Sequence, residues 1–278
     1  MEYIDKHELQ DEGNSITEDY LENQCKVYDE VSHCYRYINI DYSGSFASSG
    51  YRDRMCDLAL RSQTRYCCYC LRKLSDVKYV TLEHIIPQQS KTCDRYNFFP
   101  ELAPSKVVLT DDFQKGEDQS RPPYPHSVAW NNLVASCNGC FPESIGKTSV
   151  CCNNKRSSKE ALPVYYYSDI ADSIEYMPDG TMMATPSPRQ QYIQTTINSA
   201  NLNCQALKEI RKLWLLFSDY SLQYIYEEGR KEHTRKLLLL SVLDLEKRND
   251  ENLFSKYMKE EYWRCFMSYQ KFHEIFSS

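Results

Sequence analysis

The chain has 278 residues, a hydrophobic fraction of 41% and a formal net charge of −6, which allows one large globular domain or two small ones. Its apolar runs are short and its first residues are acidic, so we expect no transmembrane helix, no signal peptide and a cytoplasmic location. The charge is uneven: residues 1–60 carry 5 basic and 13 acidic side chains, whereas residues 61–165 carry 14 and 10. Because residues 61–165 are basic, the negative net charge of the whole chain does not exclude a nucleic-acid site.

The first part of the chain predicts helices. Ser15 and Glu18 have the spacing of a capping box, so we expect a helix from Ser15 to about Ile40 after a frayed polar segment, residues 1–14. Apolar residues at helical spacing predict a second helix over residues 51–64.

The middle of the chain predicts short strands around a long loop. Alternating Tyr, Val, Thr and Leu residues predict a strand over residues 78–84. The periodicity is lost between Pro87 and Pro125, and a loop of this length is usually functional or mobile. A strand over residues 131–136 and a short helix over residues 153–162 are expected to follow.

The last part of the chain predicts an edge strand, a hairpin and then helices. The edge strand is expected over residues 163–167, and the hairpin over residues 173–184, around the turn Pro178-Asp179-Gly180. A helical pattern then fills the C-terminal part. The fold class is therefore α+β, and the chain divides into an N-terminal helical region, a central region and a C-terminal helical region: residues 1–64, 65–188 and 189–278.

Thirteen cysteines in a chain expected to stay in a reducing compartment suggest metal binding rather than disulfides. Seven of them lie in tight groups, and two Cys-x-x-Cys knuckles can bring four sulfurs around one tetrahedral Zn²⁺ ion. Four thiolates leave no open position for water, so we expect this zinc to be structural. The predicted ligands are Cys67, Cys70, Cys137 and Cys152, with Cys140 as an alternative.

An acid and an imidazole, Glu83 and His84, end the strand predicted at residues 78–84. A neutral histidine can take a proton from water near pH 7, and a carboxylate can hold a hard ion such as Mg²⁺. Adjacent residues of a strand point to opposite faces, so a twist or bulge at residues 85–87 must bring both side chains into one cleft. His126 is interpreted as a loop histidine with its hydrogen bonds satisfied, and the alternative is a further metal ligand or phosphate contact.

The order of these motifs resembles the HNH endonuclease family, whose members have a ββα-metal fold framed by zinc knuckles. The resemblance covers about residues 65–160. It consists of Cys-x-x-Cys from Cys67, Glu-His-x-x-Pro from Glu83, Asn-Asn-Leu from Asn131 and Cys-Asn-Asn-Lys-Arg from Cys152. Three stretches are also similar to the HNH nuclease subunit of Septu-type anti-phage systems, which are sometimes encoded with retrons: Leu82–Gln88, Val134–Gly139 and Tyr176–Gly180.

The resemblance implies a role for each motif residue. His84 would be the general base, and Glu83 a ligand of a catalytic Mg²⁺ or Mn²⁺ ion. Asn132, or its neighbour Asn131, would brace the loop that holds His84.

The last motif would complete the site. Asn153, or Asn154, would be the second ligand of the catalytic ion. The family usually has two residues between this position and a lysine, whereas only Asn154 separates Asn153 from Lys155 here, and Arg156 restores the spacing. Four basic residues are expected to contact phosphates that flank the scissile bond: Lys147, Lys155, Arg156 and Lys159.

The function that the resemblance implies is metal-dependent hydrolysis of DNA phosphodiester bonds, as the effector of an anti-phage defence system that an ATPase partner controls. Two alternatives stay open. The first keeps the chemistry but changes the substrate to RNA, such as tRNA. The second is a non-catalytic zinc-containing module whose helical tails bind a protein partner.

Overall fold

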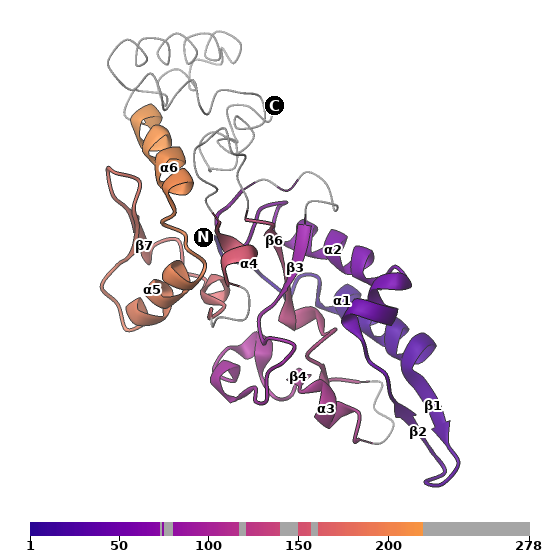
Figure 1. Cartoon of the computed structure of the whole chain (residues 1–278). Helices are drawn as coiled ribbons and strands as arrows, with labels where there is room; N and C mark the ends of the chain where they lie inside the picture. Colours follow the sequence, from indigo (N-terminus) through magenta and orange to yellow (C-terminus); the bar gives the residue numbers. More distant parts are fainter. Residues whose placement is uncertain (73, 75–79, 117–120, 140–149, 157–160, 219–278) are drawn as a thin grey trace.

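In a computed structural model, the chain is a mixture of helices and small two-stranded sheets, which confirms the α+β class (Figure 1). The structure describes all residues except 73, 75–79, 117–120, 140–149, 157–160 and 219–278. Among the described residues, the helices are α1 Gln10–Tyr20, α2 Tyr51–Ser62, α3 Thr110–Phe113, α4 Cys152–Arg156, α5 Gln190–Ser199 and α6 Gln205–Ser218. The strands are β1 Lys26–Asp29, β2 Cys34–Tyr37, β3 Val80–His84, β4 Val107–Val108, β5 Tyr124–Pro125, β6 Leu133–Cys137, β7 Ile174–Tyr176 and β8 Met182–Ala184.

The centre of the fold is the antiparallel pair of β3 and β6. Its register runs from Val80 opposite Cys137 to His84 opposite Leu133, and both predicted strands are confirmed. Every residue of β6 is buried, which suits its small and apolar sequence Leu-Val-Ala-Ser-Cys. The short helix α4 packs on β6 and begins close to the predicted start of a helix at residue 153.

Helices α1 and α2 lie against one side of this pair, and α5, α6 and β7 lie beyond α4 (Figure 1). Gln63, just after α2, binds the edge of β6 as a neighbouring strand would, because its amide donates to the carbonyl of Ala135 (2.8 Å) and accepts from the N–H of Ala135 (2.7 Å). One apolar core extends from Met1 to Ile210, so the described parts of the three predicted regions share it.

The long helix predicted from Ser15 to Ile40 is wrong. Helix α1 starts earlier and is followed by a π-helical turn and then the hairpin β1–β2, which projects from the body of the molecule (Figure 1). Aromatic residues favour the strands here: the rings of Tyr28 and Tyr35 lie 5.3 Å apart across the hairpin. Several of its apolar side chains face solvent, and Val31 at its turn is 92% exposed.

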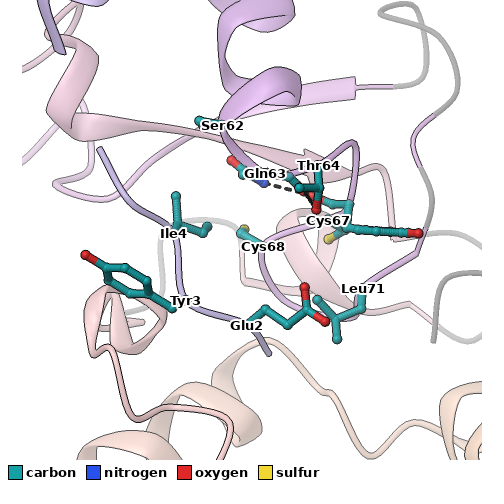
Figure 2. A pocket seen from close by; sticks show the side chains of 10 residues that line it. Glu2, Tyr3, Ile4, Ser62, Gln63, Thr64, Cys67, Cys68 and Leu71 are labelled. Carbon is teal, nitrogen blue, oxygen red and sulfur yellow. Dashed lines mark hydrogen bonds between the residues drawn. The ribbon is translucent and has the colours of Figure 1, made fainter. Parts of the chain in front are cut away.

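The prediction that residues 1–14 are frayed is also wrong. Met1 and Ile4 are buried, and the N–H of Ile4 donates to the carbonyl of Tyr165 (2.8 Å). Figure 2 shows Ile4 beside the loop that carries Cys68. The Nζ atom of the buried Lys6 donates to the carbonyl of Leu133 (2.6 Å), the residue opposite His84, so the N-terminal segment packs directly on β6.

The C-terminal part follows the prediction in two of three features. The hairpin β7–β8 is confirmed, with Ile174 opposite Ala184. Helices α5 and α6 confirm the start of the predicted helical region, and its remainder, residues 219–278, lies outside the described residues. The predicted edge strand at residues 163–167 is instead a 3₁₀ turn over Val164–Tyr166. None of the helices within the described residues combines the length and the apolar character needed to cross a membrane.

Candidate functional site

Four buried cysteines converge at the end of the β3–β6 pair. The sulfur atoms of Cys67, Cys70, Cys137 and Cys152 all lie within 4.8 Å of one another. The sulfurs of Cys70 and Cys137 are 3.7 Å apart, close to the roughly 3.8 Å expected between two thiolates bound to one tetrahedral zinc at 2.3 Å. This cluster, which is the set preferred from the sequence, can hold a metal ion such as zinc. Cys140 lies outside the described residues.

Local backbone geometry positions these thiols. The knuckle turn is closed by the N–H of Leu71 donating to the carbonyl of Cys67 (3.1 Å), and the N–H of Cys68 ties it to the carbonyl of Ala135 in β6 (3.1 Å). Cys152 begins α4 with a φ of +52°, and its N–H donates to the carbonyl of Ala200 (2.8 Å). The cluster therefore joins three segments that are far apart in the sequence.

The electrostatic surroundings of the thiols suit a bound cation. Burial raises the pKa of the Cys152 thiol well above its usual range, and the other cysteines add to the effect. Deprotonating several thiols in such a place is unfavourable without a positive charge, whereas a divalent metal binds thiolates and lowers their pKa. The donor set therefore fits a thiolate-binding ion.

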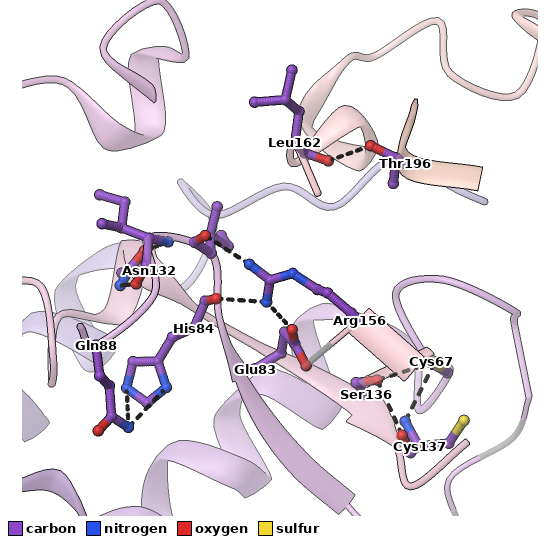
Figure 3. A network of polar contacts seen from close by, with 12 residues as sticks. Cys67, Glu83, His84, Gln88, Asn132, Ser136, Cys137, Arg156, Leu162 and Thr196 are labelled. Atoms are coloured by element: carbon purple, nitrogen blue, oxygen red, sulfur yellow. Dashed lines mark hydrogen bonds and ion pairs between the residues drawn. The ribbon is translucent and has the colours of Figure 1, made fainter. Parts of the chain in front are cut away.

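The ring of His84 is held from three sides at the end of β3. Its Nε2 atom lies 2.9 Å from the carbonyl oxygen of Ser127. The ring of Tyr42 packs edge-on against it at 4.5 Å between centroids. The amide nitrogen of Gln88 lies 3.2 Å from Nδ1, and Figure 3 shows this side chain facing the imidazole.

These contacts determine the protonation of His84. A carbonyl oxygen can only accept a hydrogen bond, so Nε2 carries the proton that points to Ser127, and Nδ1 keeps its lone pair. Burial lowers the pKa of His84 to about 4, and this effect outweighs the opposite effect of the Ser127 carbonyl. His84 is therefore a neutral imidazole at pH 7 whose Nδ1 can accept a proton.

Asn132 holds the chain immediately after His84. Its side-chain oxygen accepts from the N–H of Ile86 (2.7 Å), and its amide nitrogen donates to the carbonyls of Ile86 (3.0 Å) and His126 (2.7 Å). The neighbouring Asn131 instead donates to the carbonyl of Glu101 (2.7 Å). Of the two asparagines, Asn132 is the one that contacts the segment next to His84.

Glu83 points away from His84 and forms a buried ion pair with Arg156 of α4 (Figure 3). Arg156 also donates to the carbonyls of His84 (2.8 Å) and Ile85 (2.9 Å). Both side chains are almost fully buried, at 2% and 3% exposure. The prediction that Arg156 contacts phosphate is therefore wrong for this structure, because its guanidinium is enclosed and already paired.

The ligands predicted for a catalytic divalent ion do not gather beside His84. The Glu83 carboxylate faces Arg156 on the other side of β3, as strand alternation requires. No hydrogen bond joins Asn153 to either Glu83 or His84 within the described part of the chain, and Asn154 is exposed. The arrangement of these residues does not fit a Mg²⁺ or Mn²⁺ ion.

Of the other three basic residues predicted to contact phosphate, the structure describes one. Lys155 is exposed on α4, as a phosphate contact would need to be, whereas Lys147 and Lys159 lie outside the described residues. His126 has a buried structural role, as interpreted from the sequence: its Nδ1 accepts from the N–H of Thr110 (2.9 Å).

Three residues that orient His84 were not found from the sequence. Ser127 acts through its backbone carbonyl, which leaves no signal in residue type. Tyr42 begins the π-helical turn Tyr42–Phe46 before α2, far from the motif in the sequence. Gln88 follows the motif directly, and its position four residues after His84 was the one signal that could have identified it.

The comparisons with known proteins leave the function to be argued from this chemistry. No model of a known protein family matches the sequence, and no curated protein is significantly similar to it.

Proposed function

We propose that the protein is an HNH-type endonuclease that hydrolyses phosphodiester bonds in DNA, with β3, β6 and α4 as its ββα core. The observation that carries the proposal is the orientation of His84, whose Nε2–H donates to Ser127 and whose Nδ1 keeps a lone pair that faces the amide of Gln88, which a water molecule would have to displace. A general base must be neutral at the working pH and must be held in one orientation. Burial lowers the pKa of His84, which keeps the ring neutral but weakens it as a base, and the three-sided support holds it in one orientation.

In the proposed reaction, Nδ1 of His84 removes a proton from a water molecule as its oxygen attacks the phosphorus. The bond from phosphorus to the leaving oxygen breaks, that oxygen takes a proton from solvent water, and the imidazolium returns its proton to solvent. The carbonyl of Ser127 stabilises the imidazolium that forms, since it accepts from Nε2–H in both states. Asn132 keeps the backbone after His84 in place and so acts as a positioning residue.

The proposal assigns the four-cysteine cluster to a structural zinc. Its four thiolates would fill a tetrahedral shell and leave no position for substrate. Zinc would then attach the knuckle at Cys67 and the start of α4 at Cys152 to β6. This role is consistent with the distance between the cluster and the imidazole along β3, because Val80 and His84 mark opposite ends of the strand.

A protein partner, such as an ATPase subunit of a defence system, remains part of the proposal. The observation that favours a partner is the projecting hairpin β1–β2, on which Val27, Tyr28 and Tyr35 are each more than 40% exposed. Apolar side chains gathered on a surface are typical of protein-binding sites. A non-catalytic interaction module would use the same hairpin but would not need His84. Replacement of His84 therefore separates the nuclease from the interaction module.

Replacing His84 by alanine is expected to reduce nicking of a supercoiled plasmid by at least about 100-fold, because a general base contributes about 10²–10⁴ to the rate. Nicking is measured with purified protein in Mg²⁺ or Mn²⁺ buffer, alone and with a co-purified partner. The exposed His7→Ala is the matched control and is expected to cleave like the wild type. Equal nicking by the His84→Ala and His7→Ala proteins would show that His84 is not the general base.

The rate of cleavage is expected to stay nearly constant as the pH falls from about 7.5 to about 5.5. An ordinary histidine, with a pKa of 6.5, would become protonated in this interval and lose its activity as a base, whereas burial lowers the pKa of His84 to about 4. The pH dependence of kcat/KM measures this directly. A tenfold decline across that interval, with the fold intact by circular dichroism, would contradict the proposed environment of His84.

A further inference from the structure

A polar cavity of about 220 Å³ lies beside His84 and has no part in the proposed proton transfer. Four short segments surround it, namely residues 40–42, residues 88–91, residues 109–111 with Gln114, and residues 126–127. Three of its lining residues are the same ones that hold the His84 ring: Tyr42, Gln88 and Ser127. A group bound in the cavity would therefore lie next to the side chains that surround the imidazole.

The lining of the cavity is rich in hydrogen-bond acceptors. Asp41 and Asp111 supply carboxylates, and Gln88 and Gln114 supply amides. Among the lining residues that the structure describes, Lys91 is the only one with a cationic side chain. The ring of His126 is neutral, because its Nδ1 accepts a hydrogen bond from a backbone N–H.

This chemistry selects the class of ligand. A phosphate group would meet two carboxylates and only one lysine, so it is disfavoured. An apolar group would cover the Asp111 carboxylate without giving it a hydrogen bond, whereas Asp41 already accepts from the N–H groups of Ser43 and Gly44. An uncharged polar group that donates hydrogen bonds satisfies the acceptors of the lining.

We propose that the cavity receives one unpaired nucleobase of the nucleic acid and favours bases that carry an exocyclic amino group. The inference rests on the proposed function. If a phosphate of a nucleic acid binds at His84, the nearest uncharged polar group is the base of a nucleoside attached to that phosphate. Carboxylate and amide oxygens accept hydrogen bonds from exocyclic amino groups. Base pairing occupies these donors, so the base must be single-stranded or turned out of a duplex.

Asp111 is the acceptor best suited to a test. It is exposed on α3 and joins no ion pair or side-chain hydrogen bond within the described residues, so its replacement should not affect folding. The adjacent Asp112 is a matched control, since it lines a different cavity and lies 3.3 Å from the Nζ atom of Lys115.

The experiment measures binding of fluorescent single-stranded homopolymers of deoxycytidine and deoxyuridine to full-length protein. These two bases differ in one exocyclic group, an amine in cytosine and a carbonyl in uracil. Every protein carries His84→Ala, so that the strands stay intact during the measurement. The three proteins compared have no further change, Asp111→Asn or Asp112→Asn.

The deoxycytidine strand is expected to bind roughly tenfold more tightly than the deoxyuridine strand, and pairing it with a deoxyguanosine strand should remove the advantage. Asp111→Asn should reduce the preference to near one, and Asp112→Asn should retain it. Equal binding of both strands, no binding of either, or a preference unchanged by Asp111→Asn would overturn the inference. The wild type could also fail to cleave any substrate while the preference for deoxycytidine is still lost with Asp111→Asn. That pair of results would support the base site and reject the nuclease function.

Discussion

Replacing Cys137 by serine is expected to abolish binding of the zinc ion proposed for the four-cysteine cluster and to unfold the region around β3, β6 and α4. Cys137 ends β6, and its sulfur lies 3.7 Å from that of Cys70. A structural zinc contributes about 10–16 kcal/mol in small domains, which is as large as the whole stability of a typical domain, about 5–15 kcal/mol. The remaining core is therefore not expected to compensate for its loss.

Zinc content, measured by elemental analysis of purified protein, is the direct readout. It should fall from about one ion per chain to near zero in the Cys137→Ser protein, with a lower and broader thermal transition. Cys68→Ser is the matched control, because Cys68 is a buried neighbour of the cluster but not a member of it. Cys140→Ser tests the alternative ligand. A Cys137→Ser protein that keeps its zinc would show that Cys137 is not a ligand.

Replacing Glu83 by glutamine is expected to destabilise the fold by about 3–5 kcal/mol, because it leaves the buried Arg156 without its counter-charge. Arg156 is 3% exposed, and among the residues that the structure describes its partners other than Glu83 are backbone carbonyls. A neutral amide cannot replace the negative charge in this position. Equilibrium unfolding in urea measures the loss in the free energy of unfolding, provided that the dependence of this free energy on urea concentration, the slope m, is unchanged.

An exposed ion pair provides the control for this prediction. Asp19 and Arg54 lie 3.1 Å apart with about half of each side chain in solvent, and such pairs contribute about 1 kcal/mol or less. Asp19→Asn should therefore have a small effect. The double replacement Glu83→Leu with Arg156→Met should recover much of the loss, since it removes both buried charges. A cost for Glu83→Gln no larger than that for Asp19→Asn would contradict the buried pair.

The same pair bears on the catalytic ion predicted from the resemblance. Glu83 can bind a divalent ion only if it separates from Arg156, because its carboxylate is already neutralised and enclosed. The stability measurement is made without nucleic acid or divalent metal. It therefore reports on the ion pair alone, whatever the effect of Glu83→Gln on cleavage.

Local patterns determined several elements correctly. Alternation in residues 78–84 predicted β3, the Pro178-Asp179-Gly180 turn predicted the hairpin β7–β8, and knuckle spacing predicted the cysteine cluster. For the strand and the hairpin the physical cause lies within a few residues of the chain, whereas the cysteine cluster also needs the fold to bring Cys137 and Cys152 to the knuckle. Where the cause was tertiary, as for the buried segment at Met1 and Ile4, the local polarity of the sequence led to a wrong prediction.

The candidate site divides in the same way. The sequence by itself determined which side chains have chemistry to offer: the thiols, the imidazole of His84 and the acid of Glu83. Only the tertiary structure decided which groups these side chains contact. The two side chains point to opposite faces of β3, where Glu83 pairs with Arg156 and His84 contacts the carbonyl of Ser127. A backbone carbonyl is the same in every residue, so no sequence pattern could have identified the group that sets the protonation of His84.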